Sequence, residues 1–452
     1  MYSIVQPVNV TFKCLGKQKI DAKKRYRLIQ FCIKFFVDSG TILYNSLTGE
    51  IVLLNNEEEQ LLDCLDTQNN TVSYLIEHWF IVPEENDDIL LNDQLNTILR
   101  LTVDELNTDA ITSFTILPTT DCNARCFYCY ELSSSRISMT PKLAEDVAEY
   151  IIKVSKNKPI KIRWFGGEPL YNVEAINIIC KILAKKNVIY TSSMVSNAYL
   201  FDEKNIKRAK DLWNLKNVQI TLDGTEKVYN KCKAYIYKDD NAFVKVLNNI
   251  EKLLEAEIYV NVRVNVDDHN IKDIYILIDL LEKKFGEYKN FSAYAHLLFE
   301  DSTKKQLERS EIERHMLMTE FMKLEDYLLE KRLNRPRPAE NMVRYKHCMA
   351  DSNQSVMILP DGNLGKCEHY IESEFFGNIY SDKKDFNIIN KFKQIRPFST
   401  YCDVCQLRPK CMVLEMCPSV PRRCDSYDRK MYMRYIRQRV MASYDDFKKK
   451  TN

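Results

Sequence analysis

The sequence lacks an excess of charge of either sign: its 452 residues include 65 Lys and Arg and 63 Asp and Glu, a formal net charge of +2 at pH 7. A balance this close to neutral gives no general attraction to nucleic acid or to an anionic membrane, so neither is expected as a partner. No run of 18 apolar residues occurs, so a membrane-spanning helix is not expected. The first residues, MYSIVQPVNVTFKCLGK, lack the basic and then apolar order of a secretory signal, which predicts a cytoplasmic protein.

Hydrophobic residues make up 45% of the chain and charged residues 28%, the balance of a globular protein with ample material for buried cores. At about 150 residues per domain, the chain has room for roughly three domains. The order of apolar, charged and cysteine-rich stretches predicts three domains and a linker, at residues 1–103, 104–303, 304–345 (the linker) and 346–452.

Residues 1–103 are predicted to form a small module of strands and short helices, of the size of a winged-helix domain. TILYNS and EIVLLN flank a turn that contains Gly49, which predicts a hairpin over residues 41–55. Asn55 or Asn56 is suited to cap a following helix whose first turn carries three glutamates. The module has no basic face or base-reading signature, which disfavours DNA binding. A role in packing or dimerisation stays open.

Strand-like and helix-like stretches alternate through residues 104–303. Six runs resemble buried strands: SFTILP, IKIRWF, VIYTSSMV, NVQITL, EIYVNVRV and FSAYAHLLF. Helical patterns lie between them, over residues 141–154 and from near Val173, Asp202, Asn241 and Asn270. This order predicts an α/β fold with a parallel sheet, either open or curved into a partial barrel. Ligands of such sheets bind at the carboxyl ends of the strands.

The linker is predicted to be helical and charged, with a break at Pro336 and Pro338. The part that follows is rich in cysteine and ends in a basic stretch from Arg429 to Arg439. This stretch is predicted to form a helix whose charged face is either simply solvated or a contact for an acidic peptide.

Cysteine is unusually abundant, with 15 residues, and its distribution is uneven. Disulfide frameworks belong to small secreted chains, so clustered cysteines in this chain favour metal or iron–sulfur ligation. Three fall within the eight residues 122–129 and seven within 348–424. The scattered ones are predicted to be buried small hydrophobic residues: Cys14, Cys32, Cys64, Cys180 and Cys232.

The motif that carries chemistry follows the first predicted strand of the sheet. Cys122, Cys126 and Cys129 form a C-x3-C-x2-C loop. Three thiolates on one loop can hold three irons of a cubane cluster, which leaves the fourth iron without a protein ligand and open to a small molecule. Zinc is the alternative, although a closed structural zinc site takes four ligands.

This loop, with the aromatic Tyr128 before its last cysteine, resembles that of the radical S-adenosylmethionine (SAM) enzymes. Three further fragments, each at the end of a predicted strand, are similar to the family's motifs: Gly166-Gly167-Glu168-Pro169, Val195-Ser196-Asn197 and Thr221-Leu222-Asp223-Gly224. The resemblance implies that SAM contacts Tyr128, Gly166, Gly167, Glu168, Ser196, Asn197, Thr221 and Asp223. The chain departs from the family at Ala198, where a glycine is usual, and at Lys233, where an arginine is common.

The resemblance also implies the chemistry. The amino and carboxylate groups of SAM chelate the open iron of a [4Fe–4S] cluster held by Cys122, Cys126 and Cys129. One electron from the reduced cluster then splits SAM, and the resulting 5′-deoxyadenosyl radical abstracts a hydrogen atom from a substrate. The glutamate of the GGE motif, Glu168, is expected to accept from the methionine ammonium. A flavodoxin or ferredoxin is the expected electron donor.

The C-terminal cysteines resemble the SPASM extension of radical SAM enzymes, which holds up to two auxiliary [4Fe–4S] clusters. The resemblance implies one cluster on Cys402, Cys405, Cys411 and Cys424, and another on Cys348, Cys367 and Cys417. The fourth ligand of the latter stays open between His347, His369, a scattered cysteine and no protein ligand. Zinc ribbons are the alternative for these cysteines. Glu368 matches a position at which related sulfatase-maturating enzymes have a catalytic base, although an ordinary polar loop residue is the alternative.

A radical SAM–SPASM protein with a small front domain resembles the maturases of ribosomally made peptides, in which that domain is the RiPP recognition element. There a leader peptide adds as a strand to a sheet edge, and residues 41–55 are expected to offer that edge. The predicted function is a peptide maturase that installs a thioether or carbon-based cross-link on a precursor peptide. Epimerisation or a sulfatase-maturase-like oxidation is the alternative, and a non-catalytic iron–sulfur or zinc protein is the alternative of another class.

Overall fold

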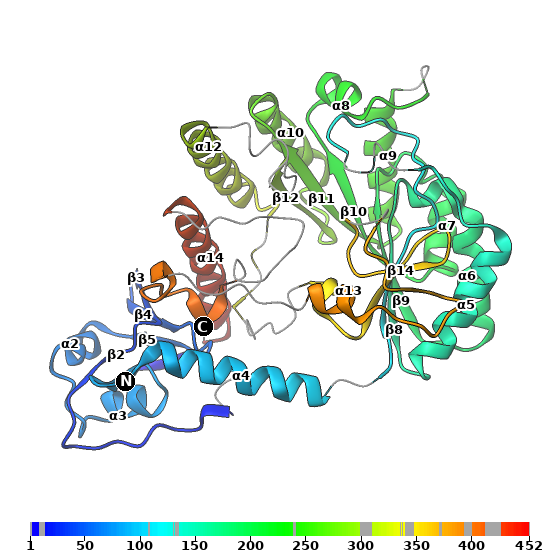
Figure 1. Cartoon of the computed structure of the whole chain (residues 1–452). Helices are drawn as coiled ribbons and strands as arrows, with labels where there is room; N and C mark the ends of the chain where they lie inside the picture. The colour runs from blue at the N-terminus through cyan, green and yellow to red at the C-terminus, as the bar shows by residue number, and fades with distance from the viewer. Residues whose placement is uncertain are drawn as a thin grey trace.

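The computed structural model describes residues 2–8, 14–106, 109–129, 131, 135–237, 241–298, 310–334, 336, 338–339, 348–369, 373–392, 400–411 and 426–451. A small N-terminal module lies at one end of the molecule and a large sheet, flanked by helices, at the other (Figure 1). The long helix α4 (Asp88–Leu106) extends from the module towards the sheet.

The large sheet is built from six parallel strands that follow one another in the chain, which confirms the predicted α/β fold. The strands are β7 (Ser113–Ile116), β8 (Ile160–Trp164), β9 (Tyr190–Ser196), β10 (Leu215–Leu222), β11 (Tyr259–Val266) and β12 (Phe291–Leu297). The connecting helices are α5 (Pro141–Ser155), α6 (Val173–Lys185), α7 (Glu203–Asp211), α8 (Glu226–Lys233), α9 (Ala242–Glu255) and α10 (Ile271–Phe285). All were expected except α8.

Helix α5 shows how local sequence sets these elements. Thr140 accepts a hydrogen bond from the amide of Leu143, and Pro141 occupies the first helical position, where its missing N–H costs nothing. Val147 and Ile151, one turn apart, are fully buried against the sheet. On β8, β11 and β12 every second residue joins the same core, so the alternate residues point to the opposite face of the sheet.

The cysteine-rich part of the chain extends this sheet. Strand β13 (Ser355–Ile358) pairs in parallel with β7, and β14 (Asn363–Gly365) and β15 (Gly377–Asn378) follow in antiparallel order. A tight turn joins β13 to β14, in which the Asp361 carboxylate accepts from the amide of Asn363 and Gly362 has φ +84°. Residues 355–378 and 113–297 therefore share one nine-stranded sheet, a continuity that the predicted boundary at residue 346 did not anticipate.

Within the described residues after β12, three α-helices lie outside the alternating pattern. Helix α12 (Glu311–Glu330), in the predicted linker, packs against β12 and α10. Helix α13 (Phe386–Lys391) follows β15. The basic tail forms α14 (Ser426–Thr451), as expected, and it lies beside the N-terminal module (Figure 1).

The N-terminal module is a four-stranded antiparallel sheet with helices on one face. Its strands, in spatial order, are β1 (Ser3–Gln6), β5 (Ile51–Leu54), β4 (Gly40–Asn45) and β3 (Cys32–Val37). Strands β2 (Tyr26–Leu28) and β6 (Ile81–Pro83) form a separate ribbon, and α2 (Asn56–Cys64) and α3 (Asn70–Glu77) complete the module. The predicted hairpin and the Asn55 cap are confirmed, the cap with a reciprocal bond from Glu58.

The expectation that residues 41–55 offer a free edge is wrong. Strands β4 and β5 each pair on both sides, because β3 and β1 flank the hairpin that they form. Within the described residues, β1 and β3 are the edge strands of this sheet.

The module and the C-terminal part of the chain share a core. The face of the sheet opposite α2 and α3 packs on Ile436 and Val440 of α14 and on Leu407. Arg408, whose side chain is 3% exposed, lies 3.0 Å from both carboxylate oxygens of Asp93 on α4. The N-terminal module is therefore anchored to the cysteine-rich part rather than tethered beside it.

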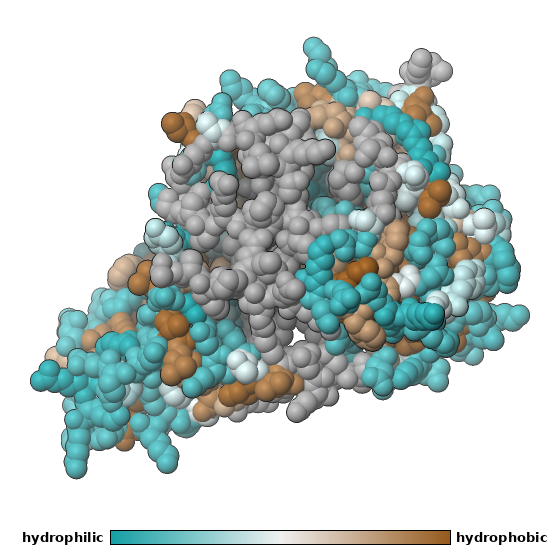
Figure 2. All heavy atoms as spheres, viewed as in Figure 1, coloured by the Kyte–Doolittle hydropathy of each residue, from teal (hydrophilic) through white to brown (hydrophobic). Residues whose placement is uncertain are grey.

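No helix within the described part of the chain is long and apolar enough to cross a membrane. Polar atoms cover much of the face in Figure 2, and apolar atoms gather at its lower edge, where Figure 1 places α4. Leu90, Ile98 and Leu101 of this helix are exposed.

Candidate active site

Four strands of the large sheet, β7 to β10, end at one edge, and each is followed by residues that the sequence analysis singled out. The cysteine loop follows β7, the Gly-Gly-Glu run follows β8, β9 ends at Ser196, and Asp223 directly follows β10. Because parallel strands present their carboxyl ends on the same side, these segments meet.

The two glycines of the second motif allow the end of β8 to lie against the cysteine loop. A Cβ atom on Gly166 would come within 2.3 Å of the carbonyl oxygen of Thr119, and one on Gly167 within 2.2 Å of that of Asp121. The amides of Gly167 and Glu168 donate to the same two carbonyl oxygens, at 3.2 and 2.9 Å. The two glycines therefore allow the backbone after β8 to pack closely against the cysteine loop of the same chain.

Glu168 joins the ends of β8 and β9 and is fully buried. Its carboxylate accepts from the Ser196 hydroxyl at 2.9 Å and from the amides of Asn197 and Leu170 at 2.8 and 3.1 Å. Burial raises the pKa of Glu168 to about 7, although these hydrogen bonds oppose the shift. The side chain is thus held in place by three donors and keeps a strong demand for a further donor or cation.

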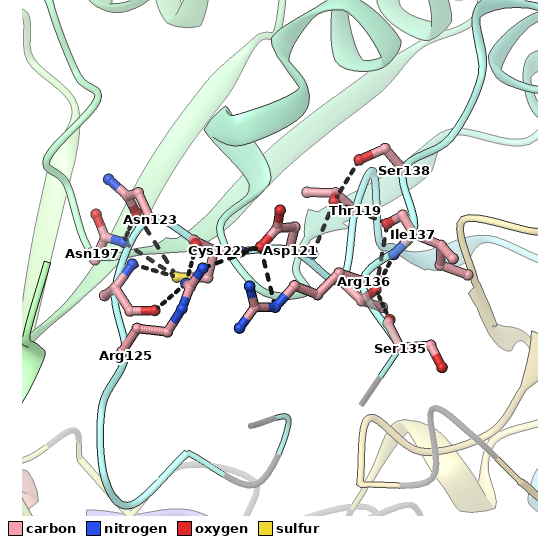
Figure 3. A network of polar contacts seen from close by, with 12 residues as sticks. Thr119, Asp121, Cys122, Asn123, Arg125, Ser135, Arg136, Ile137, Ser138 and Asn197 are labelled. Atoms are coloured by element: carbon pink, nitrogen blue, oxygen red, sulfur yellow. Dashed lines mark hydrogen bonds and ion pairs between the residues drawn. The ribbon is translucent and has the colours of Figure 1, made fainter. Parts of the chain in front are cut away.

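Asn197, whose amide donates to this carboxylate, also lies beside the first cysteine, and Figure 3 shows that second contact. Its side-chain amide donates to Asn123 Oδ1 at 2.7 Å and lies 3.8 Å from the Sγ atom of Cys122. The Cys122 sulfur also accepts from the amide of Ala124 at 3.3 Å. Asn123, fully buried, was not singled out from the sequence, because no local pattern marks a residue that acts as a partner across the site.

A second network surrounds Asp223, which is fully buried. Its carboxylate accepts from the Tyr128 hydroxyl at 2.6 Å and from the Asn265 amide at 2.9 Å, and it lies 3.1 Å from the Lys233 ammonium. Lys233 also donates to Thr221 at 2.6 Å and to Tyr128 at 2.9 Å.

Lys233 stays charged in this network. Burial by itself lowers the pKa of its ammonium, but Asp223 and Tyr128 beside it hold that pKa well above the ordinary value. The departure from arginine at this position therefore leaves a cation in the site. The sequence analysis missed Asn265, at the end of β11, because nothing in the sequence near it points to a site.

The three thiols of the loop are each half-buried. Burial is the main reason that the pKa values of Cys122 and Cys129 rise to about 12 and about 11 and that the pKa of Cys126 is raised. Neighbouring thiols add to the shift for Cys122 and Cys129. Within the described residues, no three His, Cys, Asp or Glu side chains converge closely enough to hold a single ion. In a [4Fe–4S] cluster each thiolate binds a separate iron atom, so the three cysteines of the loop suit such a cluster.

The described cysteines of the C-terminal part lie in two places. Cys348 is exposed, whereas Cys367 is buried beside Ala350 and Phe392. Cys402, Cys405 and Cys411 belong to short turns that pack near the N-terminal module. Cys417, Cys424 and His347 lie outside the described residues.

Glu368 lies against the sheet rather than free in a loop. Its carboxylate is 3.3 Å from the guanidinium of Arg163 in β8, which in turn lies over the ring of Phe165 at 4.8 Å. Arg163 is a further residue that the sequence analysis missed, since 205 positions separate it from Glu368.

Burial of the scattered cysteines is confirmed in part. Cys32 and Cys180 are buried, and Cys14 and Cys232 are half-buried. For Cys64, the last residue of α2, the prediction is wrong, because this residue lies on the solvent side of the helix and is exposed.

Comparison of sequences gives matches to radical SAM proteins. Residues 116–281 match the family model of the radical SAM superfamily. The chain is 23% identical over 395 residues to the radical SAM cyclopropyl synthase TigE of Paramaledivibacter caminithermalis, which covers 76% of this chain and 78% of TigE. A probable GTP 3′,8-cyclase of Methanococcus aeolicus is 34% identical over 158 residues, which is 34% of this chain and about half, 49%, of that protein.

Solved structures share the fold at low sequence identity. The structure of anSMEcpe with bound AdoMet and the Kp18Cys peptide has a TM-score of 0.57 at 17% identity and covers 75% of this chain and 99% of that one. Streptococcus suis SuiB bound to its precursor peptide SuiA has a TM-score of 0.52 at 14% identity, over 89% of this chain and 99% of SuiB. The matched residues run from the last residue of β7 into α10 and include the cysteine loop and its partners, and the chain therefore contains a radical SAM domain.

Proposed function

We propose that this protein is a radical SAM maturase that modifies a ribosomally made precursor peptide. One observation carries the proposal: the cysteine loop, Glu168, Asn197 and the Asp223–Lys233 pair meet at the carboxyl edge of β7 to β10. Each comes from a different strand end, and together they supply thiolate ligands, a buried carboxylate and a buried cation. The likeness to TigE and the shared fold of two peptide-bound proteins support a peptide substrate.

In this proposal Cys122, Cys126 and Cys129 would hold a [4Fe–4S] cluster, and the chemistry that this group would supply is the one-electron reductive cleavage of SAM to methionine and a 5′-deoxyadenosyl radical. Glu168 accepts from the methionine ammonium, a role that suits a buried carboxylate held in place by three donors. Lys233 supplies a buried positive charge, opposite in sign to the charge of the Glu168 carboxylate.

Other predicted SAM contacts already serve as scaffold. Thr221, Asp223 and Tyr128 hold Lys233 in position. Ser196 and Asn197 orient Glu168. The glycines at 166 and 167 bring that carboxylate next to the cysteine loop.

The cysteine-rich part is proposed to be a SPASM domain with two auxiliary clusters. Its ligands would be Cys348, Cys367 and Cys417 for one cluster and Cys402, Cys405, Cys411 and Cys424 for the other. Glu368 is proposed as the base that takes a proton as the substrate radical is oxidised. Its ion pair with Arg163 turns its carboxylate towards the sheet.

The N-terminal module is proposed to bind the leader segment of the peptide. Strand β3 is the better edge for an added strand, because Phe36 on it is 71% exposed and offers an apolar contact. A flavodoxin or ferredoxin is the proposed electron donor.

The first test is anaerobic reconstitution with iron, sulfide, SAM and a reductant. Release of 5′-deoxyadenosine by the wild type and its loss in a Cys122→Ala, Cys126→Ala, Cys129→Ala variant are expected. Cys64→Ala, a change at an exposed cysteine outside the site, is the matched control and should keep the activity. A wild type with a loaded, reduced cluster that releases no 5′-deoxyadenosine would favour a non-catalytic iron–sulfur protein.

The second test identifies the product. Short reading frames near the coding sequence, with repeated Cys, Trp, Tyr or Lys motifs, supply candidate peptides for co-expression. A mass loss of two hydrogens indicates a cross-link, and an unchanged mass with an inverted centre indicates epimerisation. An unmodified peptide with every candidate would contradict a maturase.

A further inference from the structure

We propose that Arg125 is a positioning residue that sets the reduction potential of the cluster on the Cys122–Cys129 loop. This inference rests on the proposed function and deepens it. It concerns a residue between the first two cysteines whose side chain folds back on its own loop (Figure 3).

The guanidinium of Arg125 holds two carbonyl groups of the loop. Its Nη1 atom donates to the carbonyl oxygen of Cys122 and, at 2.7 Å, to that of Ala124. The carbonyl between them, that of Asn123, accepts from the amide of Ile236 at 3.0 Å. Three consecutive carbonyl groups are therefore engaged by donors, two of them by one side chain.

This arrangement determines what the loop presents to the first thiolate. With the carbonyl of Asn123 turned to Ile236, the amide of Ala124 points at the Cys122 sulfur, 3.3 Å away. Hydrogen bonds to cluster sulfur and nearby positive charge both stabilise the reduced, more negative state. Carbonyl oxygens turned inward would do the opposite. Arg125 would thus favour the reduced cluster in two ways, by its positive charge and by fixing the orientation of the peptide groups of the loop.

The positive charge of Arg125 is only partly neutralised. Its nearest carboxylate, Asp121, is 3.9 Å away and is shared with Arg136 at 3.7 Å, so one acid serves two cations. The Asp121 carboxylate also accepts from the Cys122 amide at 2.8 Å, which orders the start of the loop. Within the described residues, Arg136 pairs with the same Asp121 carboxylate but donates no hydrogen bond to the carbonyl groups of the loop, which makes it a matched control.

The test is a potentiometric titration of the reconstituted full-length protein, in which the reduced-cluster signal is followed by electron paramagnetic resonance. For Arg125→Gln we expect the equilibrium constant for reduction to fall about tenfold, a midpoint potential lower by about 59 mV for one electron. Arg125→Lys keeps the charge but places its single donor nitrogen on a shorter side chain than the one that carries Nη1 to the two carbonyl oxygens, so a smaller shift in the same direction is expected. Arg136→Gln should stay close to the wild-type potential and iron content.

Arg125→Lys keeps the inference testable if Arg125→Gln fails to load iron. A wild-type potential in Arg125→Lys, or an equal shift in Arg125→Lys and Arg136→Gln, would overturn the carbonyl clamp. A wild-type protein that gives no cluster signal would instead refute the proposed function, and this result is distinct from any difference between variants.

Discussion

Replacing Lys233 by methionine should destabilise the radical SAM domain strongly. The ammonium lies 3.1 Å from the Asp223 carboxylate, and the two side chains are 3% and 0% exposed. At an effective dielectric constant of 20, a charge pair at this distance is worth about 5 kcal/mol. Removal of one partner from a buried pair typically costs about 3–5 kcal/mol, because the remaining charge is left without compensation. Among the described residues, the Asp223 carboxylate would then keep its hydrogen bonds from Tyr128 and Asn265.

The assay is thermal unfolding of the cluster-free protein, followed by circular dichroism. At about 2–4 °C per kcal/mol, we expect the midpoint to fall by about 10 °C. Lys231→Met, on the exposed side of the same helix, is the matched control and should change the midpoint little. Adding Asp223→Asn to Lys233→Met should recover part of the loss, because the stranded charge is then removed. Equal midpoints for Lys233→Met and Lys231→Met would refute the reasoning.

Three further predictions concern the site and its support. Gly167→Ala should disrupt the contact with the cysteine loop, since its Cβ would lie 2.2 Å from the Asp121 carbonyl oxygen. The expected result is a lower iron content after reconstitution, whereas the control variant Cys64→Ala should keep the iron content of the wild type. Burial raises the pKa of Glu168 from 4.5 to about 7, so the folded protein holds a proton that the unfolded chain releases. The contribution of this bound proton to the free energy of unfolding is fully present below pH 4.5 and is lost as the pH rises through 7. Between these two pH values the free energy of unfolding should fall by about 3 kcal/mol. Urea titrations of the cluster-free protein should show this slope, and a Glu168→Gln variant with the same slope would contradict the assignment. Arg408→Met removes the buried guanidinium that pairs with Asp93 on α4 and should loosen the N-terminal module, so hydrogen exchange in α4 should rise while that of α5 stays as in the wild type.

The order of strands and helices could be predicted because each element is encoded within a short stretch. The hairpin of β4 and β5, the Asn55 cap and helix α5 follow from apolar period and from capping residues a few positions away. The positions of the site motifs could also be predicted, since residues that follow parallel strands meet at one edge. Helix α8 was missed because its polar sequence has no clear apolar stripe, with Tyr229 and Lys233 as its buried residues.

What the sequence by itself determined is thus the local structure and the types of side chain brought to the edge of the sheet. Only the tertiary structure decided which of them became partners. Lys233 reaches Tyr128 across 105 positions, Arg163 reaches Glu368 across 205, and β13 pairs with β7. Hydrogen bonds within a turn of helix act over a few residues and leave a pattern. Contacts between distant segments depend instead on how whole elements pack, and a single sequence carries no periodic sign of them.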